Sequence, residues 1–400
     1  ITGRFAEFGE QHQAGIKAAL EDVNAAGGVN GRAVEVVYED DTSEVNAALT
    51  AGEKLVNQGL PLVMGAYSSS ITGPLAQYFT RQKRPFVVYT SADDAITKPG
   101  SDWVFRINQP SFAYATTLFD VFDQINAERG SGTLKTVVTI HGNGAFETSV
   151  ADAVDEMAKA RGYTVLQRQD YDQTGADFRP ILNRFKALNP DVLFMVSYAA
   201  DSVALMRQVQ EVGLNAKVFA GGAAGFALPG FIEGAGPAAD YVYTATMWTK
   251  DVPYPGAAEL NERLSAILGR TPSYHAAEAY VAIITAVDAL SRAASFEPDD
   301  VRAALRATDL PDTVFGPITF EDYAGYKNQA PLPAVAGLRE AVKDGAPQVW
   351  PDHPGNVLYE AHLGDRAAAD AAFAKAHAVA EISIVNPRIV TNYMETRAAV

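Results

Sequence analysis

Residues 62–89 decide the fold, and they read LVMGAYSSSITGPLAQYFTRQKRPFVVY. The stretch opens with the apolar run Leu62 to Met64 and closes with a second apolar run, Phe86 to Tyr89. Between the two runs, the apolar residues from Leu75 to Arg81 have helical spacing. A strand, a helix and a second strand, each strand apolar throughout, predict parallel strands that helices cover on both faces.

Alternating helical and strand-like patterns continue on both sides of this stretch. Before it, a helical pattern from Gly9 to Val23 precedes a predicted strand at Val34 to Tyr38, and a second helical pattern spans Val45 to Val56. After it, we expect strands near 136–140, 163–166, 192–196 and 218–220, and helices near 148–161, 177–188 and 201–213. The chain is therefore expected to be an α/β protein with two doubly wound parallel-sheet lobes.

One more strand-like run, residues 241–246, precedes the last predicted helices near 256–268, 275–293 and 298–307. Three helices are too few for a third lobe, so we expect them to complete the first. This predicts a first lobe of residues 1–115 and 244–325 and a second lobe of residues 116–243.

Composition limits the classes of protein to which the chain can belong. Its 32 basic and 48 acidic side chains give a formal charge of −16, which disfavours nucleic acid and anionic membranes as partners. No apolar run reaches the roughly 18 residues that a membrane span requires. The absence of cysteine excludes disulfides and thiol chemistry, and no secretory leader is visible. We expect a globular protein that is not integral to a membrane.

Several common nucleotide-binding, hydrolase and metal-binding motifs are absent from the sequence. It has no phosphate-binding Gly-x-x-x-x-Gly-Lys loop and no Gly-x-Ser-x-Gly elbow, and its six histidines show no metal-binding spacing. His141 follows a predicted strand, but without a base or nucleophile partner it favours a ligand-binding or structural role. Asp40 and Asp41 favour a solvated loop over a calcium site. We expect no catalysis, no metal and no cofactor.

Polar loops follow the predicted strands, at the sheet edge where doubly wound folds bind ligands. Ser68 to Ser70 offer hydroxyls and the N–H groups of a helix start to an anion such as a carboxylate. The loop Thr90 to Ala92 follows the next strand, so the two loops should converge. The alternative for the serines is that one of them only caps its own helix.

Aromatic residues hold equivalent places in the second lobe. Phe146 and Tyr198 follow predicted strands and offer apolar faces to a ligand. The alternative is that each packs in the core. Only the whole set of loops therefore predicts a ligand site.

Several stretches match one family of two-lobed proteins. Thr2 to Gly9 reads TGRFAEFG, and Asn24 to Gly31 reads NAAGGVNG. The match continues through Tyr38 to Asp41, the serine loop, Thr90 to Thr97, Tyr198, Tyr274 to Ala279 and Phe315 to Phe320. With these stretches, residues 1 to about 330 resemble leucine/isoleucine/valine-binding proteins, the type I periplasmic binding proteins that capture amino-acid-like solutes for ABC importers.

The resemblance implies which residues bind the ligand. It places the ligand carboxylate at Ser69 and at the 90–92 loop. It also surrounds the ligand with three aromatic residues, Phe8, Phe146 and Tyr198. The predicted ligand site comprises Phe8, Ser68, Ser69, Ser70, Thr90, Ser91, Ala92, Phe146, Tyr198 and Ala223.

Ala223 stands where the family's amino-acid binders have an acidic residue that pairs with the ligand ammonium. Burial of an ammonium without a counter-charge is costly. Unless Glu147, Asp93 or Asp94 takes this role, we expect a carboxylate ligand that lacks the α-amine.

The resemblance weakens at both ends of the chain. Ile1 begins after the strand expected before Thr2, so we expect the first lobe to lack its first strand. Residues 331–400 form a foreign-looking tail that resembles a fragment of the large subunit of molybdenum hydroxylases, such as carbon-monoxide and xanthine dehydrogenases. We expect no catalytic site in this tail, which reflects either a natural fusion or an artefact near residues 329–335.

The sequence thus predicts the substrate-binding component of an ABC importer for branched-chain or other amino-acid-like carboxylates. We expect it to bind by lobe closure without catalysis, as a monomer in the periplasm, and to serve an ABC permease. One alternative is a sensory ligand-binding domain of the same fold. The other, from the tail alone, is a molybdenum hydroxylase fragment.

Overall fold

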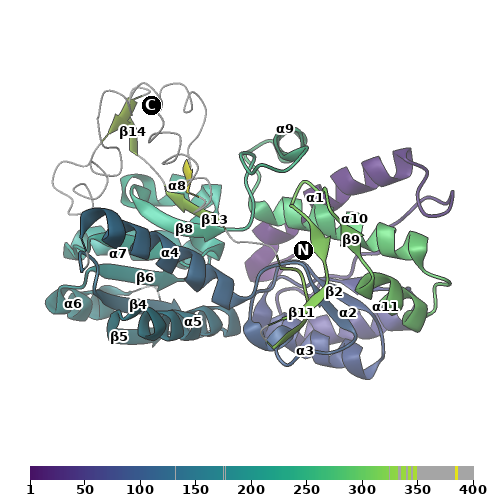
Figure 1. Ribbon diagram of the computed structural model, residues 1–400, viewed down its shortest axis with the longest axis horizontal. Coiled ribbons are helices and arrows are strands. Elements are labelled where there is room, and N and C mark those ends of the chain that lie inside the picture. Colours follow the sequence, from purple (N-terminus) through teal and green to yellow (C-terminus); the bar gives the residue numbers. More distant parts are fainter. Residues whose placement is uncertain are drawn as a thin grey trace. The chain divides into compact units, whose positions relative to one another are not determined.

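The computed structural model describes residues 1–331 apart from 131, 174, 176 and 324, and the backbone of four short strands beyond residue 334. The chain forms two compact units (Figure 1). The first comprises Ile1–Ser111 and Met247–Pro333, and the second comprises Phe112–Thr246 and Ala334–Val400. The sequence alone places the limits between the lobes near residues 115 and 243.

A five-stranded sheet forms the centre of the first unit. Its strands lie in the order β1, β2, β3, β12 and β11, with the bounds Val63–Met64, Phe86–Val88, Val104–Arg106, Tyr326–Gln329 and Glu321–Tyr323. The first four are parallel, and β11 is antiparallel to β12. The parallel pairing of β1 with β2 confirms the winding predicted from residues 62–89.

Paired helices cover this sheet. Helix α1 (Ala6–Ala25) packs along α10 (Tyr274–Arg292), and α2 (Val45–Asn57) packs on α3 (Ser69–Arg81). The remaining elements of the unit are η1 (Gly3–Phe5), η2 (Asp94–Ile96), α9 (Ala257–Leu268), α11 (Pro298–Arg306) and the antiparallel pair β9 (Asp309–Leu310) and β10 (Ile318–Thr319). The helices predicted near 256–268, 275–293 and 298–307 are therefore confirmed.

The second unit contains a seven-stranded sheet. The order is β16, β13, β8, β7, β6, β4 and β5, with the bounds Ser383–Val385, Val335–Leu338, Val242–Thr246, Val218–Gly221, Val192–Val196, Thr136–Gly142 and Thr164–Tyr171. Strands β4 to β8 are mutually parallel where they pair. The helical elements are α4 (Ser111–Arg129), α5 (Ala145–Arg161), α6 (Arg179–Leu188), α7 (Ala199–Val212), η3 (Ala224–Ala227), α8 (Pro229–Ala235) and η4 (Gly236–Ala239). This confirms the predicted second series of strands and helices.

Burial follows the prediction that the parallel strands are covered on both faces. Every residue of β2, β6 and β7 is buried. In the first unit, Phe79 of α3 packs on Phe86 of β2, with ring centroids 4.8 Å apart. In the second unit, Tyr171 of β5 meets Phe178 at 4.7 Å. Helix-to-sheet packing of apolar side chains is what stabilises each unit.

The strand predicted at Val34 to Tyr38 is wrong. Residues 33–40 form no strand, and Val37 and Tyr38 remain 46% and 44% exposed. A strand exists only where a neighbouring backbone pairs with it. The nearest edge of the sheet is β1, and a cavity separates it from this segment.

The predicted tail, residues 331–400, lies almost entirely outside the described residues. Its described backbone includes β13, which is antiparallel to β8, and β16, which is antiparallel to β13. Two further strands, β14 (Ala341–Lys343) and β15 (Ala346–Gln348), pair with each other. The resemblance of the tail to a molybdenum hydroxylase stays a prediction.

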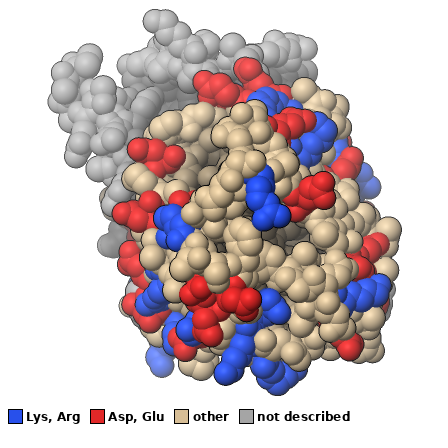
Figure 2. All heavy atoms as spheres, turned by 90° about the vertical axis from the view of Figure 1, so that its right-hand side faces the viewer, with Lys and Arg blue, Asp and Glu red and all other residues tan. Residues whose placement is uncertain are grey.

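Charges of both signs share the surface. On the face drawn in Figure 2, acidic and basic side chains intermingle and leave no broad area of one sign. In the first unit, Arg263 pairs with Asp22 (2.7 Å) and Arg306 pairs with Asp322 (2.7 Å). Within the described part of the chain, none of the helices is both long enough and apolar enough to span a membrane.

Candidate functional site

Two hydroxyl-bearing loops meet at the carboxyl ends of β1 and β2 in the first unit. Ser91 donates hydrogen bonds to the carbonyl oxygens of Tyr67 (2.7 Å) and Ala66 (3.1 Å). The backbone N–H of Asp93 donates to the Ser69 hydroxyl at 3.2 Å. Because β1 and β2 are adjacent and parallel, the loops that follow them are neighbours, as the sequence predicts. The structure therefore brings the predicted residues of the two loops together.

The start of helix α3 carries no side-chain cap. Ser68 is its N-cap residue, but the Ser68 hydroxyl makes no capping hydrogen bond. The backbone N–H groups of Ile71 and Thr72 donate to the Ser68 carbonyl oxygen instead. The alternative in which Ser68 caps its own helix is therefore not observed. An uncapped helix start, with its positive dipole end, favours a bound anion.

An aromatic cluster adjoins the serine loop. Phe8 of α1 stacks on Tyr67, with ring centroids 3.9 Å apart and planes 15° apart. His275 of α10 meets both rings edge-on, at 4.9 Å from Phe8 and 5.4 Å from Tyr67. The structure thus places the predicted residue Phe8 beside the loop that holds Ser68.

Sequence reasoning missed two members of this cluster, Tyr67 and His275. Tyr67 directly precedes the serines, and that adjacency is a signal that could have found it. His275 lies more than 200 residues further along the chain, and only the packing of α10 on α1 brings it to the loop. The sequence offers no local signal for that contact.

Buried polar groups lie beneath the second loop. The Thr90 hydroxyl is hydrogen-bonded to Nε2 of His12 at 3.1 Å, and the Asn108 amide donates to the Thr90 carbonyl oxygen. Burial lowers the pKa of His12 to about 3, and it lowers the pKa of His275 well below 6.5. Both imidazoles are therefore neutral at pH 7. The predicted contact of the Thr90 hydroxyl with ligand stays a prediction, since His12 already engages it.

Glu278 of α10 belongs to the same buried layer. Its side chain is 0% exposed, and within the described structure neither carboxyl oxygen forms a hydrogen bond of good geometry. Burial raises its pKa well above 4.5, and a nearby Thr90 side chain offsets only part of that shift. Glu278 is therefore held as a neutral acid. The sequence gives no sign of this, because an acidic residue on a helix usually faces solvent.

The predicted residues of the second unit meet at the ends of three neighbouring strands. Strands β4, β6 and β7 are adjacent and parallel, and Phe146, Tyr198 and Ala223 lie just beyond them. The rings of Phe146 and Tyr198 are 5.7 Å apart at 38°. The backbone N–H of Gly225 donates to the Ser197 carbonyl oxygen at 3.1 Å, which ties the last two loops together. These three predicted residues are thus brought together.

Ala223 is fully buried and supplies no charge to this end of the sheet. Of the acids considered in its place, Asp93 accepts a hydrogen bond from the Ala95 N–H at 3.0 Å and caps η2. Asp94 lies in the first turn of the same element. Glu147 is fully buried and accepts a hydrogen bond from Gln173. Asp93 and Glu147 are therefore already engaged within their own units.

The backbone at Ala223 is strained. Its φ of 63° and ψ of −146° lie in a region that suits glycine and costs other residues about 1 to 3 kcal/mol. Gly221 and Gly222 precede it, and the N–H of Ala223 donates to the Gly221 carbonyl oxygen at 2.9 Å. Strain of this kind concentrates at functional sites.

Ala223→Gly is expected to raise the free energy of unfolding by roughly 1 kcal/mol, because relief of strain exceeds the entropy that glycine costs. The matched control is Ala153→Gly in the interior of α5, which should lower the free energy of unfolding by about 1 kcal/mol or more. Urea denaturation of both variants measures whether each substitution raises or lowers the free energy of unfolding. A loss of stability in both would contradict the strain argument.

His141 has a structural role. Its Nδ1 donates to the Gly142 carbonyl oxygen at 2.7 Å, and its Nε2 accepts from Nε of Arg168 at 3.0 Å. Arg168 in turn pairs with Asp152 (2.6 Å) and Asp155 (3.0 Å). Burial lowers the pKa of His141, so its neutral form is kept. Both ring nitrogens are used within the second unit.

Across the described residues, no group of three or more His, Asp or Glu could hold a metal ion.

Comparison with known proteins gives one consistent family. Residues 1–335 match the family described as periplasmic binding protein. The Leu/Ile/Val-binding protein homolog 8 of Brucella abortus is 28% identical over 324 residues, which cover 78% of this chain and 79% of the relative. These matches confirm the resemblance of residues 1 to about 330 to the leucine/isoleucine/valine-binding proteins.

Two solved structures show the same fold. A leucine-binding protein from Thermotoga maritima is 22% identical with a TM-score of 0.75, and the match covers 87% of this chain and 94% of that one. A solute-binding protein of an ABC transporter from Rhodopseudomonas palustris, solved with 3,4-dihydroxybenzoic acid, is 22% identical with a TM-score of 0.72 over 86% and 92% of the two chains. The predicted α/β fold is confirmed.

Proposed function

We propose that this chain, which belongs to the periplasmic binding protein family, is the solute-binding component of an ABC importer for small carboxylates. It works in the periplasm, hands its ligand unchanged to a membrane permease and performs no catalysis. The observation that carries the proposal is the junction of two hydroxyl-bearing loops at the uncapped start of α3, held by Ser91 and Ser69. Hydroxyls and helix-start N–H groups are the donors that a carboxylate requires.

We further infer that the ligand need not carry an α-ammonium group. Ala223 is an uncharged, buried residue, and two of the acids considered in its place, Glu147 and Asp93, accept hydrogen bonds within their own units. Both kinds of ligand occur among proteins of this fold. The Thermotoga maritima structure is a leucine-binding protein, whereas the Rhodopseudomonas palustris protein holds an aromatic acid without an amine. The stacked Phe8 and Tyr67 rings favour an apolar or aromatic body on the ligand.

Isothermal titration calorimetry with matched ligands tests this inference. Leucine and 4-methylpentanoate differ only in the α-ammonium group, and benzoate adds an aromatic body. We expect 4-methylpentanoate or benzoate to bind at least about tenfold more tightly than leucine, since an unpaired buried ammonium costs more than 1.4 kcal/mol. Tighter binding of leucine would contradict the argument from Ala223. Failure of all carboxylates to bind would contradict the proposed ligand class.

Ser69→Ala is expected to weaken carboxylate binding by roughly 10-fold to 100-fold, the effect of losing one hydrogen bond to a charged group. The control is Ser265→Ala on α9, whose hydroxyl bonds only within its own helix to the Asn261 carbonyl oxygen. Calorimetry on the ligand that binds best compares the two variants. If the Ser69→Ala and Ser265→Ala variants bound the ligand with equal affinity, Ser69 would not be a ligand-binding residue.

A further inference from the structure

One segment of the first unit, residues 106–111, holds the backbone carbonyl groups of the loop that follows β2. The Asn108 side-chain amide donates to the Thr90 carbonyl oxygen. Ser111 donates twice to the Ala92 carbonyl oxygen, from its backbone N–H at 2.8 Å and from its hydroxyl at 3.0 Å. Because Ser111 is the last residue of the first unit before the chain continues into the second, all of these contacts lie within one unit.

Arg106, the last residue of β3, holds the next carbonyl group of the loop. Its Nη1 donates to the Asp93 carbonyl oxygen at 2.7 Å, and its Nε donates to Oε1 of Gln329 at 2.6 Å. The Gln329 amide in turn donates to the Asn108 carbonyl oxygen at 2.7 Å. Arg106, Asn108 and Ser111 are all fully buried. The donors that hold the loop are therefore themselves fixed in place by packing and by β12.

The contacts of the carbonyl groups decide where the N–H groups of the loop point. The peptide bonds of this loop are trans, and in a trans peptide the C=O and the N–H point in opposite directions. The Ala92 C=O points to the 106–111 segment, and the N–H of Asp93 accordingly points away from it and donates to the Ser69 hydroxyl at 3.2 Å. By the same geometry, the Ser91 N–H points away from that segment.

This arrangement leaves the Ser91 N–H available to a ligand. Within the described structure the group donates no hydrogen bond, although Ser91 is only 2% exposed. Buried backbone N–H groups without an acceptor are rare in native proteins. We propose that Arg106, Asn108 and Ser111 are positioning residues, which hold the loop so that this N–H faces the ligand carboxylate. The inference rests on the proposed function, because it assigns the three residues to the same carboxylate site.

The benefit of this arrangement is that the loop is ordered before the ligand arrives. Binding loses affinity when a loop must be ordered at the same moment, and donors that are already oriented avoid that loss. The three positioning residues act through the backbone of the loop and need not touch the ligand. Their substitution should therefore weaken carboxylate binding even where the protein remains folded.

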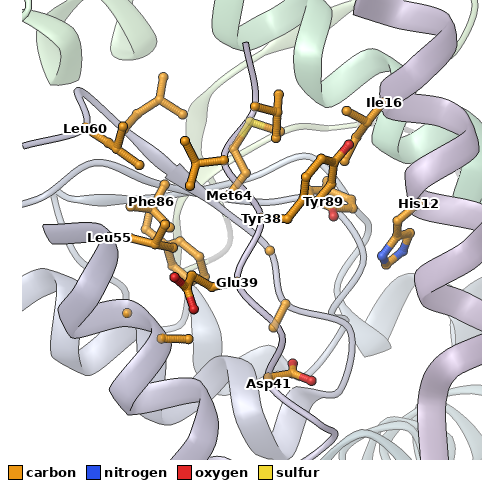
Figure 3. Close-up of a pocket in the computed structure, with 18 of the residues that line it drawn as sticks. His12, Ile16, Tyr38, Glu39, Asp41, Leu55, Leu60, Met64, Phe86 and Tyr89 are labelled. Atoms are coloured by element: carbon orange, nitrogen blue, oxygen red, sulfur yellow. The ribbon is translucent and has the colours of Figure 1, made fainter. Parts of the chain in front are cut away.

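The positioning contacts are separate from the cavity of about 290 Å³ beside β1. Figure 3 shows His12 and Tyr89 at the border of that cavity. None of the described residues from Thr90 to Ser111 forms part of its wall. The argument for the three positioning residues therefore does not depend on that cavity.

Isothermal titration calorimetry on the 400-residue chain tests the proposal, with 4-methylpentanoate and benzoate as probes. Ser111→Ala removes the hydroxyl donor but keeps the backbone N–H bond to Ala92, and it should weaken carboxylate binding by roughly 3-fold to 10-fold. Arg106→Lys keeps the positive charge, but one ammonium cannot hold both oxygens that the guanidinium holds, and a similar loss is expected. The matched control is Ser265→Ala, whose hydroxyl also donates to a backbone carbonyl oxygen and which should stay within about twofold of wild type.

Two further measurements separate positioning from a purely structural role. Urea denaturation gives the stability of each variant, since a residue that only stabilises the fold would change stability and leave the affinity of the folded protein unchanged. Nuclear magnetic resonance of serine labelled with nitrogen-15 follows the Ser91 amide, whose proton should shift downfield when wild type binds a carboxylate, and less in Ser111→Ala.

The outcomes distinguish this inference from the proposed function. If wild type binds a probe but both folded variants bind it with wild-type affinity, or if the Ser91 amide does not shift, the positioning role is wrong and the carboxylate site stands. If wild type binds neither probe, the proposed ligand class fails and this inference fails with it.

Discussion

Replacing Glu278 by glutamine is expected to raise the free energy of unfolding at pH 7, and the gain should vanish below about pH 4.5. Burial raises the pKa of Glu278 well above 4.5, so the folded protein keeps a proton that the unfolded chain releases. Between these two pKa values the folded state binds more protons, and stability falls as the pH rises. The cost is about 1.4 kcal/mol for each pH unit within that window. Glutamine has the shape of the protonated acid and does not titrate.

Urea denaturation of wild type and Glu278→Gln at pH 4, 5.5 and 7 measures this effect. The difference between the two proteins isolates Glu278, because the titration of His12 is common to both. His12 acts in the opposite direction, since its lowered pKa of about 3 makes stability fall as the pH drops below 6.5. Glu259→Gln on the exposed face of α9 is the control and should change stability by less than about 0.5 kcal/mol. If Glu278→Gln raised the free energy of unfolding by the same amount at every pH, Glu278 would not be a buried acid that is neutral in the folded protein.

The elements that were predicted correctly are those whose signal is local. The run of residues 62–89 specifies two strands and a helix, because each apolar run is short and the helix has its own period. Adjacency of the two polar loops follows directly, since parallel neighbours end at the same sheet edge. The positions of Ser69 and Ser91 therefore needed no information beyond the chain order.

The failures concern contacts between distant segments. Val34 to Tyr38 has strand composition, but a strand forms only against a paired neighbour, and the edge of β1 lies across a cavity. His275 reaches the serine loop only because α10 packs on α1. Residue types alone indicate neither the missing partner of residues 34–38 nor the packing of α10 on α1. The same limit applies to Glu278, whose burial depends on what covers its helix.

Side-chain direction was also beyond the sequence. Ser91 lies in the predicted loop, but it donates its hydroxyl to the backbone of the serine loop at Ala66 and Tyr67. Its observed contribution is to hold the two loops together. Thr90 likewise turns its hydroxyl to His12. Ser69 accepts a hydrogen bond from the Asp93 N–H, and the family resemblance assigns the ligand carboxylate to it, so the serine substitution is made at Ser69.

Gly15→Ala is expected to lower the free energy of unfolding by about 3 kcal/mol or more. A Cβ atom at Gly15 would lie 1.9 Å from the Ala276 carbonyl oxygen and 3.0 Å from the Tyr280 backbone nitrogen, both on α10. The clash is with backbone, so no rotamer change relieves it, and α1 must move away from α10. The control, Lys17→Ala two residues along α1, removes only an exposed pair with Glu21 and should cost less than about 0.5 kcal/mol.

The same displacement should weaken ligand binding, because the two helices carry opposite sides of the aromatic cluster. Phe8 lies on α1 and His275 lies on α10, and their rings are in edge contact at 4.9 Å. Separation of the helices opens that contact and moves Phe8 relative to Tyr67, which leads into the serine loop. We therefore expect the near-ultraviolet circular dichroism of the folded Gly15→Ala protein and its carboxylate affinity to change together. A stable variant with wild-type affinity would show that the close approach of α1 and α10 does not position the site.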